Sequence, residues 1–159
     1  MRGDEGRKLL SGRYDRDPGR WRPYTYGCIV EVPVIEGMWG ENTVTIMNQP
    51  FVMERINHSV IGNINDYQAT GLADDGMYYV EWREENSHYQ NQPILARNAF
   101  GTKEYPLALT VPLGFAGNRT LTFRVTNAYT RLLTPDTETF SVELTLHGAA
   151  DWGPDRSEG

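Results

Sequence analysis

The sequence predicts an all-β fold, a two-sheet antiparallel sandwich preceded by an extended N-terminal arm. Three observations support this fold class. From residue 24 onward apolar and polar residues alternate with a period of two, not with the helical period of about 3.6. Turn residues interrupt this pattern at short intervals, and only the segment 93–100 has the composition of a short helix. Alternation gives each sheet one buried and one solvated face, so two sheets packed face to face account for it.

The first half of the sandwich is expected to contain three strands and a hairpin. The three strands are predicted at 28–35, 42–47 and 51–62, and the two hairpin strands at 66–70 and 77–83. In the first strand Val30, Val32 and Val34 share one face, and Pro33 on the other face is typical of an edge strand or a bulge. The hairpin turn contains Asp-Asp-Gly, because aspartate and glycine tolerate the positive φ of tight turns.

The last strands define most of the expected core. They are predicted at 106–111, 119–126 and 139–148. The strand 119–126 alternates most regularly, with Leu121, Phe123 and Val125 facing inward. The other side chains expected to face inward are Tyr78, Val80, Trp82, Phe140, Val142, Leu144 and Leu146. On the strand 77–83 the side chains expected to face solvent are Tyr79, Glu81 and Arg83.

Charge divides the chain into an arm, a body and a tail. Residues 1–23 carry a net charge of +3, so the remainder carries −9 to give the total of −6. A chain of 159 residues is long enough for one domain with a sizeable core and too short for two. We therefore expect a basic N-terminal arm at 1–23, a β-sandwich domain at 24–148 and a polar C-terminal tail at 149–159.

Composition argues against several functional classes. With 39% hydrophobic and 23% charged residues, the chain is typical of a soluble globular protein. No stretch approaches the roughly 18 apolar residues of a membrane span, and the N-terminus lacks the apolar run of a signal peptide. We therefore expect synthesis in the cytoplasm and no membrane partner. The lone Cys28 excludes an intramolecular disulfide, and three scattered histidines leave little material for a zinc site.

The stretch EWREENSHYQNQP, residues 81–93, concentrates carboxylates, a histidine and aromatic rings as a reaction centre would. A glycosidase needs two carboxyl groups that face each other across a sugar, whereas the adjacent Glu84 and Glu85 point to opposite faces of a strand. No ligand spacing typical of a metal site occurs around His88. We therefore expect no catalytic, cofactor or metal site, and interpret the stretch as the polar rim of an interface that Trp82 anchors in the core.

Aromatic residues beside asparagine, glutamine and arginine are typical of protein interfaces. The expected interface residues are Arg7, Arg13, Arg16, Arg20, Trp21, Arg22, Tyr24, Trp39, Glu84, Glu85, His88, Tyr89 and Gln90. The same composition suits a carbohydrate-binding face, for which the expected residues are Trp39, Trp82, His88 and Tyr89. Nucleic acid is not an expected partner, because four acidic residues dilute the positive field of the basic arm.

Three segments, 43–62, 71–101 and 120–135, combine predicted strands with aromatic loops rich in asparagine and glutamine. In this style the chain resembles the jelly-roll decoration, or cement, proteins of tailed-bacteriophage capsids. The resemblance implies a virion protein, made in the host cytoplasm, that binds several copies of the major capsid protein on the head surface. It also implies a jelly-roll sandwich and allows a homodimer or homotrimer. A tail or baseplate component and a carbohydrate-binding module remain alternatives, and alternation leaves the strand order open.

The resemblance also suggests a role for the basic arm at 1–23. A clip that binds two or more subunits gains affinity because its second contact forms at high effective concentration. An arm that reaches a neighbouring subunit adds contact area, at the entropic cost of ordering about twenty residues. We therefore expect the arm to be needed for attachment to an assembled shell and not for folding of the body.

Overall fold

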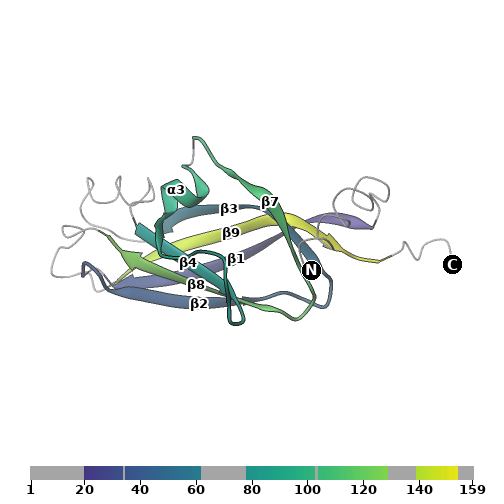
Figure 1. Cartoon of the computed structure of the whole chain (residues 1–159), viewed down its shortest axis with the longest axis horizontal. Coiled ribbons are helices and arrows are strands. Elements are labelled where there is room, and N and C mark those ends of the chain that lie inside the picture. The colour runs from purple at the N-terminus through teal and green to yellow at the C-terminus, as the bar shows by residue number, and fades with distance from the viewer. Residues whose placement is uncertain (1–19, 34, 62–77, 103, 129–138, 154–159) are drawn as a thin grey trace.

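The computed structural model describes residues 20–33, 35–61, 78–102, 104–128 and 139–153. These residues form two antiparallel sheets that pack against each other, which confirms the expected all-β sandwich (Figure 1). The predicted strand 66–70, its turn, Val34 and residues 129–138 lie outside the described residues. Within the described ranges, no helix is long and apolar enough to cross a membrane.

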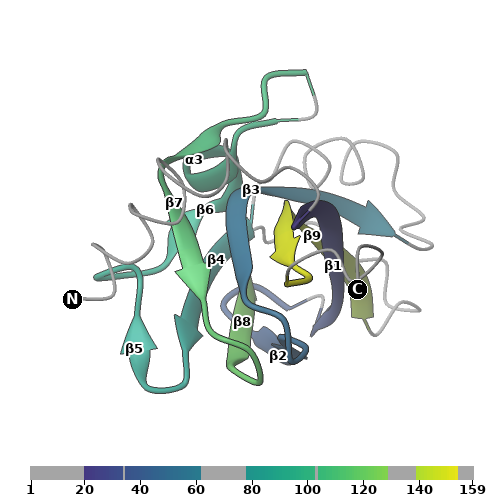
Figure 2. The ribbon, with the colours of Figure 1, turned by 90° about the vertical axis from the view of Figure 1, so that its right-hand side faces the viewer.

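Each sheet combines strands from distant parts of the sequence. The strands of the first sheet are β1 (Trp21–Pro33), β9 (Thr139–Asp151), β3 (Phe51–Ile61) and β7 (Ala108–Phe115), in this spatial order. Those of the second sheet are β2 (Trp39–Thr45), β8 (Thr120–Asn127), β4 (Tyr78–Glu84) and β5 (Ser87–His88), with β6 (Ile94–Leu95) also paired to β4. The short helix α3 (Ala96–Phe100) lies within the segment 93–100 where the sequence predicts one, and contacts β3 and β4 (Figure 2).

The strand pairing is that of a hairpin rolled into a sandwich. β1 pairs with β9, β2 with β8, β3 with β7, and β4 with β5. The pairs are therefore nested: the first strand pairs with the last, and each following pair lies closer to the middle of the sequence. Successive strands from β1 to β4, and again from β7 to β9, alternate between the two sheets. This double Greek-key connection is the jelly roll, and it settles the strand order that alternation alone leaves open.

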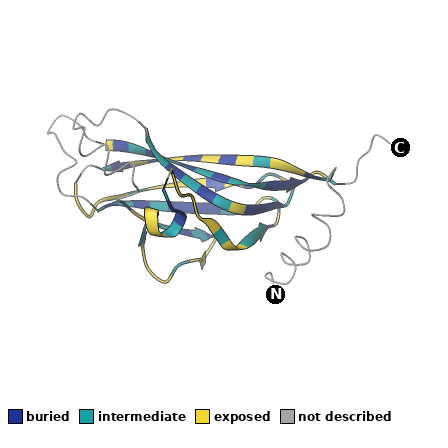
Figure 3. Ribbon diagram, turned by 90° about the horizontal axis from the view of Figure 1, so that it is seen from above, coloured by how far each residue is buried: buried dark blue, intermediate teal, exposed yellow. Residues whose placement is uncertain are grey.

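The core lies between the sheets, and buried residues alternate with more exposed ones along the strands (Figure 3). Leu121, Phe123 and Val125 of β8 are fully buried, as the sequence predicts. The Trp82 ring stacks on the Phe123 ring, with centroids 5.7 Å apart and planes 12° from parallel. Offset stacking of this kind adds to the free energy gained by burying the two rings.

The sandwich begins earlier and ends later than the bounds 24–148 expected from the sequence. β1 starts at Trp21, which is opposite Asp151 of β9 in an unbroken antiparallel register. The alternation of buried and exposed residues along β1 breaks at this end, because Trp21 and Tyr26 are both buried but are an odd number of residues apart. Trp21 packs with Val52 and Ala149 in a separate apolar cluster, whereas Tyr26 packs in the main core. The last residues of the predicted arm and the first residues of the predicted tail are therefore paired strand residues.

Candidate binding surfaces

β4 turns back into β5 through Glu85 and Asn86 and forms a short hairpin at the end of the second sheet (Figure 2). The expectation that Glu84 faces solvent is wrong, because this residue is only 3% exposed. Glu84 has the same phase as the buried Val80 and Trp82 of β4, and the period-two pattern therefore turns it inward. The sequence-based prediction places Glu84 on the interface rim only because its side chain is charged.

The buried Glu84 carboxylate has partners that offset the cost of removing it from water. The Tyr89 hydroxyl donates a hydrogen bond of 2.8 Å to Oε2, and Arg119 Nε lies 3.5 Å from Oε1. A buried carboxylate without such partners costs several kcal/mol of folding free energy, roughly. Glu84 therefore ties the β4–β5 hairpin to the turn that precedes β8.

Tyr89 packs against core residues with one side of its ring and remains 36% exposed. Its ring stacks on Trp82 with centroids 4.2 Å apart and planes 11° from parallel, and its edge contacts Phe115. Trp82 itself is buried. The four residues expected for a carbohydrate site, Trp39, Trp82, His88 and Tyr89, therefore do not form one exposed face.

Glu85 and His88 lie on the surface at the tip of the β4–β5 hairpin. Glu85 has a positive φ of 51°, its backbone N–H donates to the Thr120 carbonyl at 3.0 Å, and its side chain accepts from Thr120 N–H at 3.1 Å. His88 pairs in register with Arg83. Gln90 is half-buried, and its Oε1 accepts no hydrogen bond from the described residues. The exposed polar rim is thus smaller than the stretch 81–93.

Glu84→Gln is expected to lower the free energy of unfolding by about 1–3 kcal/mol, because a buried amide replaces a charged acceptor beside Arg119. The matched control is Glu31→Gln on the exposed face of β1, which should change stability by less than about 0.5 kcal/mol. Urea denaturation at neutral pH measures both values. Equal stability of the two variants would show that the Glu84 contacts contribute nothing.

The residues expected at the end of the basic arm lie at the joined ends of β1 and β9. Arg20 forms a bidentate ion pair with Asp151, in which Nε lies 2.6 Å from Oδ1 and a terminal guanidinium nitrogen lies 2.8 Å from Oδ2. Trp21 is buried, which contradicts its expected place on an exposed interface, because it covers Val52 and Ala149. Arg22 is exposed and Tyr24 is half-buried, while Arg7, Arg13 and Arg16 lie outside the described residues.

The outward side of the second sheet carries a patch of aromatic and charged side chains that we call the outer aromatic face. It consists of Trp39, Glu41, Tyr79, Glu81, Arg83 and Arg124. Of these, only Trp39 was among the expected interface residues. The signal for the others was present in the sequence, because β2, β8 and β4 alternate and the residues between their buried positions must face outward.

The three acidic side chains of the stretch 81–93 do not converge. Glu81 lies on the outer aromatic face, with Oε1 3.6 Å from an Arg124 nitrogen. Glu84 points into the core and Glu85 lies in the hairpin turn. Their orientations follow from the alternation of β4, since Glu81 and Glu84 are an odd number of residues apart.

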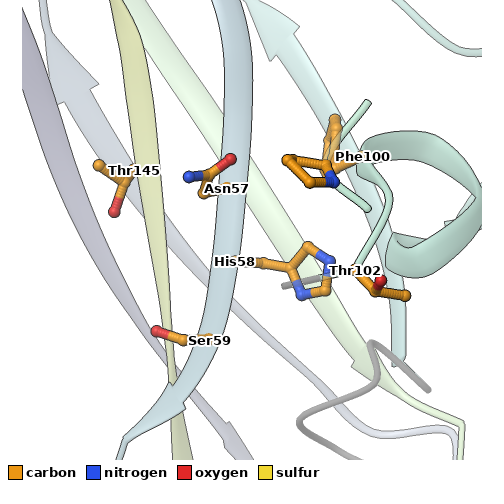
Figure 4. Close-up of a pocket in the computed structure, with 7 residues that line it drawn as sticks. Asn57, His58, Ser59, Phe100, Thr102 and Thr145 are labelled. Atoms are coloured by element: carbon orange, nitrogen blue, oxygen red, sulfur yellow. The ribbon is translucent and has the colours of Figure 1, made fainter. Parts of the chain in front are cut away.

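A pocket of about 280 Å³ lies beside β3, where β3 extends beyond its pairing with β7 (Figure 4). Its lining includes Asn57, His58, Ser59, Phe100, Thr102, Pro106 and Thr145. His58 is buried, with Nε2 2.6 Å from the Gly101 carbonyl oxygen and Nδ1 2.6 Å from the Tyr78 hydroxyl. Because a carbonyl only accepts, Nε2 carries the hydrogen, and in the neutral ring Nδ1 accepts from the tyrosine hydroxyl. Sequence reasoning missed this residue, since its partners are distant in sequence.

A second histidine, His147, lies near this pocket on β9. Burial lowers the pKa of His147, and the nearby Arg55 lowers it further. The ring is therefore neutral at pH 7, and its Nε2, 3.2 Å from Asn57 Nδ2, is free to accept a hydrogen bond from that amide. This contact joins β9 to β3 next to the pocket.

Cys28 lies inside β1 and is buried in the core. Burial raises the pKa of its thiol to about 11, so the thiol is protonated at neutral pH. Within the described ranges, no three histidine, cysteine, aspartate or glutamate side chains come together as a potential metal site. Cys28 thus packs as a small apolar side chain of β1.

Comparison with known proteins gives no family assignment. The chain matches no protein-family model, and no curated protein and no solved structure is significantly similar to it. Its function is therefore inferred from the strand topology and from the surfaces described above.

Proposed function

We propose that this chain is a non-enzymatic structural protein of a tailed-bacteriophage virion that binds the assembled head and stabilises it as a decoration protein. The observation that carries the proposal is the nested strand pairing of a jelly roll, β1 with β9 through β4 with β5. It supports the resemblance to jelly-roll decoration proteins because that resemblance implies this strand order. Fold alone does not determine function, so the proposal needs a binding test.

The surfaces of the body suit contact with protein neighbours. The tip of the β4–β5 hairpin presents Glu85 and His88 next to the half-exposed Tyr89, and these residues combine charge, hydrogen-bonding groups and an aromatic ring. Such a mixture is typical of the rim of a non-obligate interface. A clip with several weak contacts of this kind holds a shell together through avidity rather than through one strong site.

The arm has a firm attachment point at the start of β1. The Arg20–Asp151 ion pair is supported by two backbone contacts of the same corner: Trp152 N–H donates to the Arg20 carbonyl at 2.8 Å, and Gly153 N–H donates to Asp151 Oδ1 at 2.9 Å. If residues 1–19 bind a neighbouring capsid subunit, the sandwich would therefore be held to that subunit without a further loss of conformational entropy at this corner. In this proposal the arm and the hairpin tip contact different capsid subunits.

Deletion of residues 1–19 is expected to weaken attachment to assembled heads by at least about 100-fold, because one arm of a multivalent contact is lost. The truncation ends before Arg20 so that the ion pair with Asp151 is kept, and the melting temperature should stay within a few degrees of the full-length value. Co-sedimentation with heads measures attachment. Deletion of residues 154–159 is the control and should leave attachment unchanged. Undiminished attachment of the 1–19 deletion would refute a role of the arm.

A further inference from the structure

The outer aromatic face is an ordered surface on three neighbouring strands. Trp39 of β2 and Tyr79 of β4 are both register partners of Thr126 on β8, so the two aromatic residues flank one threonine. In the next row along the strands, Glu41 and Glu81 flank Arg124 in the same way. Trp39 is 49% exposed and Tyr79 is 40% exposed.

Contacts within the sheet hold the Trp39 ring in place. The guanidinium carbon of Arg124 lies 4.0 Å from the centroid of the Trp39 ring, so one face of the indole is covered by a cation–π contact. Arg124 is itself fixed by Glu41, with Nε–Oε2 at 3.1 Å, and by Glu81 at 3.6 Å. Because Arg124 occupies one side of the ring, the exposed half of Trp39 is a flat apolar surface whose orientation is set before any ligand binds.

The charges of this face are balanced and already ordered by one another. Glu41 and Glu81 oppose Arg83 and Arg124, and Arg83 reaches Glu41 with a nitrogen–oxygen distance of 3.4 Å. The face is therefore formally neutral, although residues 24–159 of the chain are strongly acidic. A neutral surface offers no net attraction to phosphates, sulfates or uronates. It does offer carboxylate acceptors and guanidinium donors held in fixed positions, which suits a ligand rich in hydroxyl groups.

The spacing of the two rings suits a ligand longer than one sugar ring. Trp39 and Tyr79 are separated by two strand spacings, or about 10 Å between their backbones. An oligosaccharide with one pyranose ring over the indole and a later one over the phenol would span this distance. The C–H face of a pyranose stacks on aromatic rings, while its hydroxyl groups hydrogen-bond to charged and polar side chains beside them.

From these contacts we propose that the outer aromatic face binds a neutral oligosaccharide, with Trp39 and Tyr79 as stacking platforms and with Glu41, Glu81 and Arg83 as hydrogen-bonding groups. Arg124 is a positioning residue, because it acts by holding the Trp39 ring. This inference goes beyond the proposed binding to capsids and does not depend on it. A virion protein with such a face would carry a weak glycan-binding surface on the side of the second sheet that faces away from the core.

The test is a glycan array probed with the full-length protein, followed by calorimetric titration with the neutral oligosaccharide that gives the strongest signal. Neutral oligomers of glucose, mannose, xylose and N-acetylglucosamine are the probes, and a polyuronate and a sulfated dextran are the anionic comparison. Trp39→Ala and Tyr79→Ala should each weaken binding at least about tenfold, a loss of roughly 1.4 kcal/mol. The matched control is Tyr105→Ala, which removes a 76% exposed ring elsewhere and should leave the affinity unchanged.

A second measurement on the unmodified protein keeps the proposal falsifiable if Trp39→Ala fails to fold. In a nitrogen–proton correlation spectrum, the indole signal of Trp39 should shift during titration with the same oligosaccharide, whereas that of the buried Trp82 should move far less. The proposal is overturned by binding to the anionic polymers alone, by no glycan binding, or by glycan binding that Trp39→Ala and Tyr79→Ala leave intact. A Trp39 signal that stays unchanged during titration overturns it as well.

Discussion

Gly148→Ala is expected to destabilise the sandwich by at least about 3 kcal/mol, the upper range for a single substitution. Gly148 lies in β9, between Tyr24 of β1 and Met53 of β3. A Cβ at this position would lie 1.8 Å from the Val52 carbonyl oxygen and 2.8 Å from the Val52 carbonyl carbon. The clashing atoms belong to the backbone of a paired strand, so relief requires β9 and β3 to separate and their hydrogen bonds to stretch.

The control for Gly148→Ala is Gly27→Ala in the adjacent strand β1. Nothing lies within 4 Å of a Cβ built on Gly27, and its φ is not in the left-handed region. This variant should be within about 0.5 kcal/mol of the unmodified protein, because alanine lowers the entropy of the unfolded chain without a clash. Urea denaturation of both proteins measures the difference. Equal midpoints for the two variants would contradict the close approach of β9 to β3.

His58→Ala is expected to lower the free energy of unfolding by about 2–4 kcal/mol. The substitution leaves the Gly101 carbonyl and the Tyr78 hydroxyl without the histidine, and a buried polar group that loses its partner costs about 1–3 kcal/mol. It also removes ring contacts with Tyr78 and Phe100, whose centroids lie 5.6 Å and 6.5 Å from the imidazole. Because Gly101 follows α3, the bond from His58 holds the segment after that helix against β3.

Two variants separate the histidine contacts from general effects of mutation. Tyr78→Phe keeps the ring but removes the hydroxyl, so it should cost about 1 kcal/mol, less than His58→Ala. His88→Ala removes the exposed histidine of β5 and should cost less than about 0.5 kcal/mol. Thermal and urea denaturation rank the three proteins. If His58→Ala is as stable as His88→Ala, the buried hydrogen bonds do not stabilise the fold.

The alternation of the sequence was sufficient to predict the fold class and the core of the later strands. Leu121, Phe123 and Val125 are buried as expected, because each strand of a sandwich has one face in the core. The start of β1 could not be predicted in this way. There Trp21 belongs to a small apolar cluster of its own and Pro23 and Gly27 interrupt the pattern, so register with β9, rather than periodicity, determines the strand.

The binding surfaces were less predictable because they depend on contacts between distant parts of the chain. Glu84 was expected to face solvent because it is charged, but its phase on β4 buries it and Tyr89 and Arg119 stabilise it there. The contact between Arg124 and Trp39 joins β8 to β2 across 85 residues and required the strand order. Alternation assigns a residue to a face, whereas neighbours on that face follow from topology.

The most direct test of the proposed function is co-sedimentation of the purified full-length protein with assembled heads of the tailed phage that the proposal takes as its source. Isolated tails and unassembled major capsid protein are sedimented in parallel. We expect saturable binding to heads at a fixed ratio to the major capsid protein, with weak binding to the unassembled subunit, because several subunits must be engaged at once. Binding to tails alone, or no binding to heads at saturating concentration, would contradict it.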